Sequence, residues 1–256
     1  MNSSPRKITV YIMSFNEARQ IRAVLESVKW ADELIVVDSF STDGTVEIAR
    51  EFGARIISEK FCGFGKLRNF ALDAAQNDWM VSIDSDERCV PEFVEELRRT
   101  LENPQHAAYF VPRLNTFLGG PVRYGGMYPD YRQPQVFNRR QFRYREDLVH
   151  EGFDCTGSIG HFKTPILQHP WPTLAVILWK MDRYTTLMAQ RRFENGKHAS
   201  VWKMLFSPPI GFARKYIFQQ GFRDGTRGLV IAIMHGCYSF IKHAKLWELE
   251  LNQKAK

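Results

Sequence analysis

The sequence predicts an α/β fold in which a mostly parallel sheet is covered by helices on both faces. Strand-like and helix-like segments alternate over residues 1–105, and the strand-like runs are apolar throughout. Apolar strands joined by helices are typical of parallel strands that are buried on both faces. Residues 171–256 combine helical periodicity with basic and aromatic side chains, which predicts a helical amphipathic extension at the C-terminus.

Each element of the predicted sheet rests on a local signal. Val, Ile and Tyr cluster in the strand-like runs, apolar residues recur at helical spacing between them, and Pro91 stands where the first turn of a helix tolerates a missing N–H. The predicted elements are, in order, strand 8–13, helix 16–29, strand 33–38, a helix ending near 52, strand 54–58, a helix near 66–76, strand 79–84 and a helix from Pro91.

The pattern changes after residue 105 to short strands and turns, followed by helices from Pro172 onward. A loop at 119–126 holds four glycines, so we expect it to be mobile. We expect the helices to break at Ser207-Pro208-Pro209, because proline removes a backbone donor. The chain therefore divides into a domain of residues 1–170 and a helical basic region of residues 171–256.

Composition indicates a globular protein with an uneven charge distribution. Hydrophobic residues make up 44% and charged residues 25% of the 256 residues, which excludes disorder of the whole chain. Residues 1–128 hold 15 Lys+Arg and 18 Asp+Glu (net −3), and residues 129–256 hold 20 and 10 (net +10), which together give the net charge of +7. We expect an acidic catalytic or metal-binding half and a basic half that faces a polyanion.

The cysteines and the apolar segments bear on the cellular compartment. The four cysteines form no C-x-x-C pair, which favours reduced thiols in the cytoplasm over a zinc ribbon or a disulfide framework. The apolar run near the N-terminus is too short for a signal peptide, and the uncharged stretches 164–179 and 228–241 are too short to span a bilayer. We therefore expect neither secretion nor a transmembrane helix.

Carboxylates follow three of the predicted strands, where ligands bind in parallel α/β sheets. Glu17 follows the first strand, Asp38 ends the second, and Asp84 and Asp86 form a D-x-D motif at the end of the fourth. Such hard oxygen ligands suit Mg²⁺ or Mn²⁺, and a cation there would neutralise a diphosphate leaving group. A solvated turn is the simpler alternative. A D-x-D phosphatase is another, although it normally has Thr or Val where this chain has Arg88.

Four sequence blocks, in this order, resemble the family 2 glycosyltransferases of GT-A fold. The blocks are Ser14-Phe15-Asn16-Glu17, the run from Val37 to Thr45 that includes Asp38, Lys66-Leu67-Arg68-Asn69 and Asp84-Ser85-Asp86-Glu87. His150-Glu151, Gln168-His169 and Gly221-Phe222-Arg223-Asp224-Gly225 extend a looser resemblance to bacterial lipopolysaccharide inner-core β-1,4-glucosyltransferases over nearly the whole chain.

The resemblance implies an inverting, metal-dependent hexosyltransferase that moves glucose from UDP-glucose onto a heptose of the lipopolysaccharide inner core. It divides the first domain into a donor-binding half, 1–105, and an acceptor-side half, 106–170. It further implies donor-binding roles for some residues and Mg²⁺ or Mn²⁺ ligation for others. The donor-binding residues would be Ser14, Asn16, Glu17, Asp38, Arg68 and Asp84, and the metal ligands would be Asp86, Asp84 and His169.

Each of these roles has a simpler structural alternative. Asn16 and Asp38 could only cap turns, Arg68 could be a solvated helix residue, and His169 could be structural. Asp43 is expected to cap the helix that follows it, because its place before Gly44-Thr45 is typical of turns.

An inverting transfer needs a carboxylate that accepts the proton of the attacking acceptor hydroxyl. The candidates are Glu146, Asp147, Glu151 and Asp154. We favour Glu151, because it stands in a His-Glu pair where the resembled enzymes place one, with Asp147 second. Each candidate could instead pair with an arginine, since arginines are frequent at 139–145.

The basic C-terminal half fits an acidic glycolipid acceptor and a peripheral position on the cytoplasmic face of the inner membrane. No nucleic acid partner is expected. An acceptor on another lipid-linked or cell-surface glycan is one alternative. A basic membrane-binding module without catalytic activity is another, although the carboxylates at the strand ends argue against it.

Overall fold

The computed structural model describes residues 6–146 and 152–254, which form two compact units. The first unit contains residues 1–113 and 130–168, and the second contains residues 114–129 and 169–256. The expected division at residue 170 lies close to the second crossing of the chain between the units. The segment 114–129 was expected in the first domain, but it is grouped with the C-terminal helices.

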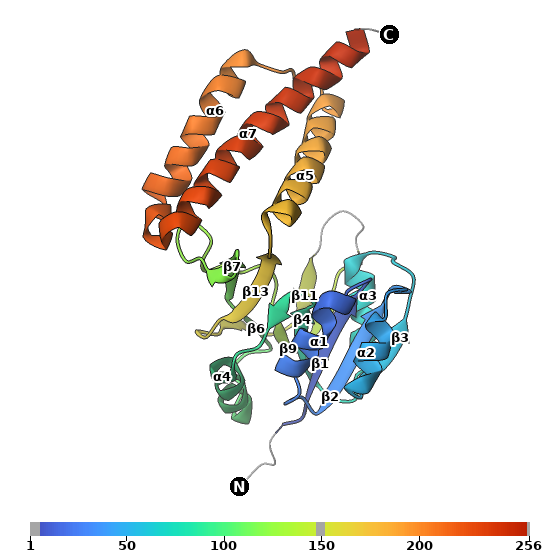
Figure 1. The fold of residues 1–256 in the computed structure, drawn as a ribbon. Helices are drawn as coiled ribbons and strands as arrows, with labels where there is room; N and C mark the ends of the chain where they lie inside the picture. The colour runs from blue at the N-terminus through green and yellow to red at the C-terminus, as the bar shows by residue number, and fades with distance from the viewer. Residues whose placement is uncertain (1–5, 147–151, 255–256) are drawn as a thin grey trace. The chain divides into compact units, whose positions relative to one another are not determined.

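A seven-stranded sheet forms the centre of the first unit (Figure 1). Its order is β12-β6-β9-β4-β1-β2-β3, and β1 pairs in parallel with both β2 and β4. Only β9 pairs antiparallel with its neighbours in this sheet, so the expected mostly parallel sheet is confirmed. The strands are β1 (Ile8–Ser14), β2 (Glu33–Asp38), β3 (Arg55–Ser58), β4 (Trp79–Asp84), β6 (Ala108–Phe110), β9 (Val136–Asn138) and β12 (Ile159–His161).

Two separate cores cover the two faces of this sheet. Successive residues of β1 point to opposite faces, so Val10 and Ile12 belong to one core and Tyr11 belongs to the other. The helices α1 (Ala18–Ser27), α2 (Thr45–Glu51) and α4 (Pro91–Glu102) contribute to the first core, and α3 (Phe64–Ala74) contributes to the second. Helices therefore cover both faces, as the apolar strands predict.

Short strands complete the first unit. The strand β5 (Glu87–Arg88) follows directly after β4 and pairs antiparallel with Leu167 and Gln168 of β13 (Ile166–Trp171). The strands β10 (Phe142–Tyr144) and β11 (Phe153–Cys155) form a separate antiparallel pair. The β5 pairing joins residue 168 to the turn after β4.

The second unit consists of a short hairpin and long helices, and the long helices run alongside one another in Figure 1. The helix α6 continues through Pro208 and Pro209, so the break expected there is wrong. It packs closely on α7, since a Cβ at Gly236 would stand 3.2 Å from the Pro208 carbonyl oxygen, and this packing outweighs the missing donors. The elements are β7 (Arg113–Phe117), β8 (Gly120–Pro121), α5 (Leu174–Glu194), α6 (Val201–Ala213), a π-helix (Arg214–Phe218), a 3-10 helix (Gly221–Asp224) and α7 (Gly225–Lys254).

The glycine-rich loop at 119–126 is held by hydrogen bonds within the second unit. The Asp224 carboxylate accepts the backbone N–H groups of Arg123, at 3.1 Å, and Tyr124, at 2.8 Å. Lys215 Nζ donates to the Gly125 carbonyl at 2.7 Å. The Asp224 of the sequence block at 221–225 therefore anchors this loop, which the sequence suggested would be mobile.

Two further expectations concern cysteines and membrane spans. All four cysteines are free thiols. None of the helices in the described parts of the chain combines the length and the apolar composition required to cross a bilayer.

Candidate functional site

The sheet register aligns the polar ends of three strands in the first unit. Ser14 at the end of β1 is paired with Asp38 at the end of β2, and Met13 is paired with Asp84 at the end of β4. Because neighbouring parallel strands end together, the carboxylates predicted from separate blocks share one edge of the sheet. This edge is the candidate site.

Asp38 is buried and shapes the turn that follows β2. Its Oδ1 accepts a hydrogen bond from Ser14 Oγ at 3.0 Å, and its Oδ2 accepts the backbone N–H of Ser41 at 2.8 Å. Ser14 and Asp38, both expected to bind the donor, are therefore bonded to each other. In the structure Asp38 caps this turn, as the simpler alternative expects. The contact of Asp38 with a donor stays a prediction.

Asn16 links the loop after β1 to the loop after β2. Its φ of 55° lies in the left-handed region, which asparagine tolerates better than most residues. Its side-chain Oδ1 accepts the N–H of Thr42 at 2.9 Å, and its own N–H donates to Ser41 Oγ at 2.8 Å. Asn16 is exposed at this edge, so its expected position beside the donor fits its location.

Asp43 caps helices, as its sequence context predicts. Its Oδ1 accepts the N–H of Thr45, the first residue of α2, at 3.2 Å, and its Oδ2 accepts the N–H of Ala18, the first residue of α1, at 3.0 Å. The Thr45 hydroxyl in turn accepts the N–H of Glu17 at 2.8 Å. One aspartate therefore ties the starts of two helices together below the site.

The D-x-D turn is supported from below by a buried acidic side chain. Glu87 is fully buried, and its Oε2 accepts the N–H of Asp84 and the side-chain N–H of Gln135, both at 2.9 Å. Its other oxygen accepts a hydrogen bond from Arg113 Nε at 2.5 Å. Burial and then the charge of Asp84 raise the pKa of Glu87 to about 7, although Arg113 opposes this.

Glu17 and Asp86 bring two negative charges close together beside the turn. Burial is the main cause that raises the pKa of Glu17, a hydrogen bond from Ser85 opposes it, and the charge of Asp86 raises it further. Gln168 Nε2 approaches both oxygens of Asp86, at 3.5 and 3.4 Å. Glu17 and Asp86 are therefore electrostatic neighbours, as the predicted site requires.

Two arginines that were not expected at the site contribute to it. Burial lowers the pKa of Arg88, and the charges of Asp86 and Glu17 act in the opposite direction. Burial also acts to lower the pKa of Arg132, but its partner Asp130, together with more distant carboxylates that include Asp84, raises it overall. Arg88 directly follows the D-x-D-E block, whereas only the fold brings residue 132 to this edge.

Arg68 lies on α3 among aromatic side chains. Its guanidinium stands 5.1 Å from the centre of the Tyr144 ring, and its NH1 donates to Gln133 Oε1 at 3.2 Å. The hydroxyls of Tyr144 and Tyr11 are hydrogen-bonded to each other at 2.9 Å. Burial is the main cause that raises the pKa of both tyrosines, whereas the charge of Arg68 lowers it. Arg68 is thus half-buried and held in place, unlike a solvated helix residue.

The chain that leads into the predicted base is anchored on α3. Asn69 Nδ2 donates to the Tyr144 carbonyl at 2.9 Å and to Glu146 Oε1 at 3.0 Å. Asp154 is exposed and paired with Arg145 at 2.5 Å, and this partner lowers its pKa, so Asp154 is poorly suited to act as the base. The favoured candidates Glu151 and Asp147 lie outside the described residues.

His169 belongs to the second unit, whereas Asp84 and Asp86 belong to the first. The Nδ1 atom of His169 lies 2.8 Å from Thr116 Oγ1 within that second unit. Over residues 6–146 and 152–254, no group of three or more His, Cys, Asp or Glu side chains could hold a metal ion by itself. The three-residue ligand set of Asp84, Asp86 and His169 therefore stays a prediction.

Comparison with known proteins identifies the family of the chain that carries this edge. Residues 9–163 match the family model for glycosyl transferase family 2. The chain belongs to this family. The matched residues contain the whole D-x-D edge and every strand of the large sheet except the first residue of β1. The GT-A type of α/β fold and the glycosyltransferase activity expected from the four sequence blocks are thereby confirmed.

Several relatives of this glycosyltransferase match it over most of its length. The lipopolysaccharide core biosynthesis glycosyltransferase LpsC of Rhizobium meliloti is 30% identical over 94% of this chain and 92% of its own. The uncharacterized glycosyltransferase RP128 of Rickettsia prowazekii is 24% identical over 97% of this chain and 89% of its own. The similarity thus extends into the C-terminal helices, beyond the residues of the family model.

A similar solved structure is glucosyl-3-phosphoglycerate synthase from Mycobacterium tuberculosis in complex with Mn²⁺, UDP and glucosyl-3-phosphoglycerate. It is 32% identical to this chain with a TM-score of 0.37, and the match covers 43% of this chain and 44% of that one. This glycosyltransferase therefore corresponds to less than half of that protein.

Proposed function

We propose that this glycosyltransferase moves a hexose, glucose from UDP-glucose, onto a heptose of the lipopolysaccharide inner core with inversion at the anomeric carbon. The observation that carries the proposal is the gathering of Glu17, Asp84 and Asp86 at the ends of β1 and β4. The name of its relative LpsC, a lipopolysaccharide core biosynthesis enzyme, supports the choice of acceptor. A different lipid-linked glycan is the alternative acceptor.

The residues at the sheet edge fit a divalent cation. Their oxygen atoms are hard ligands, and burial together with the neighbouring charge of Asp86 already raises the pKa of Glu17. Mg²⁺ or Mn²⁺ held by Asp86, with Asp84 and His169 as further proposed ligands, would neutralise the diphosphate as it leaves. Asn16, Asp38 and Arg68 are proposed to orient the nucleotide, since Asn16 follows β1, Asp38 ends β2 and Arg68 is held on α3 against the Tyr144 ring.

An inverting transfer requires a base on the side of the acceptor. We propose Glu151, with Asp147 second, and the bonds of Asn69 to Tyr144 and Glu146 hold the chain that precedes both. Glu151→Gln should lose transfer while it keeps donor binding. If Glu151→Gln retains transfer and Asp147→Asn abolishes it, the roles are reversed.

The metal site is tested by transfer from a radiolabelled UDP-sugar with and without EDTA. Asp86→Ala should lower the rate by at least about a hundredfold, because metal stabilisation of the leaving group is worth several kcal/mol. Asp78→Asn is the matched control, since Asp78 is an acidic residue of the same unit whose carboxylate pairs with Arg140 at 2.7 Å. Full activity of Asp86→Ala in EDTA would refute the metal role.

The second unit is proposed to hold the enzyme peripherally on the cytoplasmic face of the inner membrane, where an acidic glycolipid acceptor is presented. Exposed aromatic and aliphatic side chains on α5, α6 and α7 support this, together with the excess of Lys and Arg in residues 129–256. Removing α7 would disrupt the packing of the unit, so point substitutions on exposed side chains are the appropriate test.

A further inference from the structure

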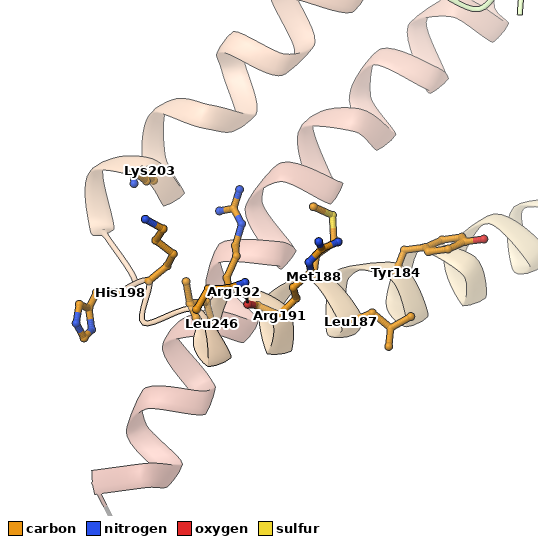
Figure 2. Close-up of a pocket in the computed structure, with 10 residues that line it drawn as sticks. Tyr184, Leu187, Met188, Arg191, Arg192, His198, Lys203 and Leu246 are labelled. Atoms are coloured by element: carbon orange, nitrogen blue, oxygen red, sulfur yellow. Dashed lines mark hydrogen bonds between the residues drawn. The ribbon is translucent and has the colours of Figure 1, made fainter. Parts of the chain in front are cut away.

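A groove in the second unit has no part in the proposed transfer reaction. It has a volume of about 890 Å³ and lies where the end of α5, the start of α6 and α7 meet. Figure 2 shows Arg191 and Arg192 on α5, Lys203 on α6 and Leu246 on α7 around it. The lining residues are Tyr184, Leu187, Met188, Arg191, Arg192, Asn195, Lys197, His198, Lys203 and Leu246.

The lining of the groove is strongly basic. Five of the ten residues are Lys, Arg or His, and none is acidic. Only His198 has an acidic partner within the described ranges, Glu250 at 3.1 Å, whereas the two arginines and two lysines have none there. Like charges at close range repel one another, so an anion in the groove would be stabilising.

A buried histidine next to these cations responds to their charge. His243 lies on α7 and is buried, and its Nδ1 has no hydrogen-bond partner among the residues that the structure describes. Burial first, and then the charges of Arg192, Lys242 and Lys203, lower its pKa to about 4. The histidine is therefore neutral near pH 7 and adds no charge of its own to the groove.

The groove is apolar as well as basic. Tyr184, Leu187 and Met188 form its wall on α5, and between 40% and 55% of each side chain is exposed. Beside Lys203, Trp202 is 70% exposed and its ring stacks on Phe206 at 5.5 Å. Exposed aromatic rings next to basic groups are typical of segments at a membrane surface.

We propose that this groove binds the phosphate of an anionic membrane lipid, with its acyl chain along Tyr184, Leu187 and Met188. The inference rests on the proposed membrane association and names the ligand that it requires. Arginine favours phosphate because its planar guanidinium donates two parallel hydrogen bonds. Trp202 and Phe206 would lie in the headgroup region next to the bound lipid.

The test is sedimentation with vesicles of phosphatidylcholine that contain phosphatidylglycerol. The double variant Arg192→Gln/Lys203→Gln should bind these vesicles roughly thirtyfold more weakly, the factor expected for two charges at an anionic surface. The matched control is Arg183→Gln/Arg214→Gln, which removes two cations of the same unit outside the groove. It should weaken binding less than about threefold. Equal weakening by both variants would overturn the site.

Two further vesicle arms decide the chemistry of the ligand. Vesicles given the same surface charge with oleate should bind more weakly, since a carboxylate replaces the phosphate, and equal binding would overturn phosphate recognition. Inorganic phosphate alone should leave the thermal midpoint unchanged. A raised thermal midpoint in inorganic phosphate, together with normal vesicle binding by Arg192→Gln/Lys203→Gln, would mean that the groove binds a soluble phosphate. That result would overturn the proposed lipid site.

Folding and catalysis are separated from lipid binding by two additional measurements. Lys197→Gln changes one residue in the connection between α5 and α6 and should weaken vesicle binding roughly fivefold, even if the double variant does not fold. An unchanged affinity of this variant would count against the site. Metal-dependent hydrolysis of the UDP-sugar, measured without vesicles, should be normal in every groove variant. If the wild-type enzyme itself does not hydrolyse the UDP-sugar, the proposed function is refuted, but lipid binding in the groove is not.

Discussion

The acidic side chain beneath the D-x-D turn should make the stability of the first unit depend on pH. Glu87 is fully buried, and its pKa is raised from 4.5 to about 7 by burial and by Asp84, against the effect of Arg113. A carboxyl group whose pKa rises on folding binds its proton more tightly in the folded state. The stability that it contributes is therefore complete below pH 4.5 and is lost as the pH rises through about 7.

The magnitude follows from the interval between the two pKa values. From 4.5 to about 7, at about 1.36 kcal/mol per pH unit, Glu87 should cost the folded protein about 3 kcal/mol on going from acid to neutral pH. Glu87→Gln has no proton to lose at this position, so its free energy of unfolding should lack this decrease. The variant should therefore gain stability relative to wild type as the pH rises.

The assay is urea unfolding in EDTA, followed by tryptophan fluorescence at about pH 4.5 and about pH 8. Trp79 is buried in β4, so its fluorescence reports on the first unit. The wild type and Glu87→Gln have the same tryptophans, so their signals can be compared directly. Glu96→Gln is the control of opposite sign. Burial raises the pKa of Glu96, but hydrogen bonds from Thr164 and Lys163 lower it overall, so its contribution to stability is lost only as the pH falls below 4.5, and Glu96→Gln should not gain stability relative to wild type between the two assay pH values. An equal difference between wild type and Glu87→Gln at both pH values would refute the reasoning.

Two further predictions concern packing and loop anchoring. Asp224→Ala removes the acceptor of the Arg123 and Tyr124 N–H groups and should lower the free energy of unfolding by about 1–3 kcal/mol in calorimetry, whereas Asp224→Asn should lose less; equal losses would contradict the anchoring role. Leu25→Ala in the buried face of α1 should cost about 2–5 kcal/mol in urea unfolding, whereas Glu26→Ala on the exposed face should stay within about 0.5 kcal/mol, and similar costs would contradict the assigned faces.

The α/β core could be predicted because its signals are local. The apolar run at 33–38 and the D-x-D motif at the end of the fourth predicted strand each lie within one short segment. The assignment of Asp43 as a helix cap also held, since its partner Thr45 is two residues away. Periodicity, capping and turn chemistry depend on neighbours in sequence, so the helices and strands of the first hundred residues can be predicted from local patterns.

The prolines of α6 and the glycines at 119–126 show where this reasoning fails. Both were interpreted from local propensity, as a helix break and as a mobile loop. In the structure, α6 packs on α7 at Gly236, and Asp224 holds the loop from about a hundred residues away. Tertiary packing overrides propensity at such positions, and no pattern near Pro208 shows it.

For the candidate site, the sequence by itself determined which carboxylates stand at strand ends and to which family the chain is similar. Only the tertiary structure showed that Ser14 and Asp38 are bonded to each other, that Glu87 and Arg113 support the D-x-D turn, and that residue 132 reaches the same edge. The physical reason is distance along the chain. A strand end is defined by its own residues, whereas a buried ion pair or a shared edge exists only when segments that are far apart in sequence pack together.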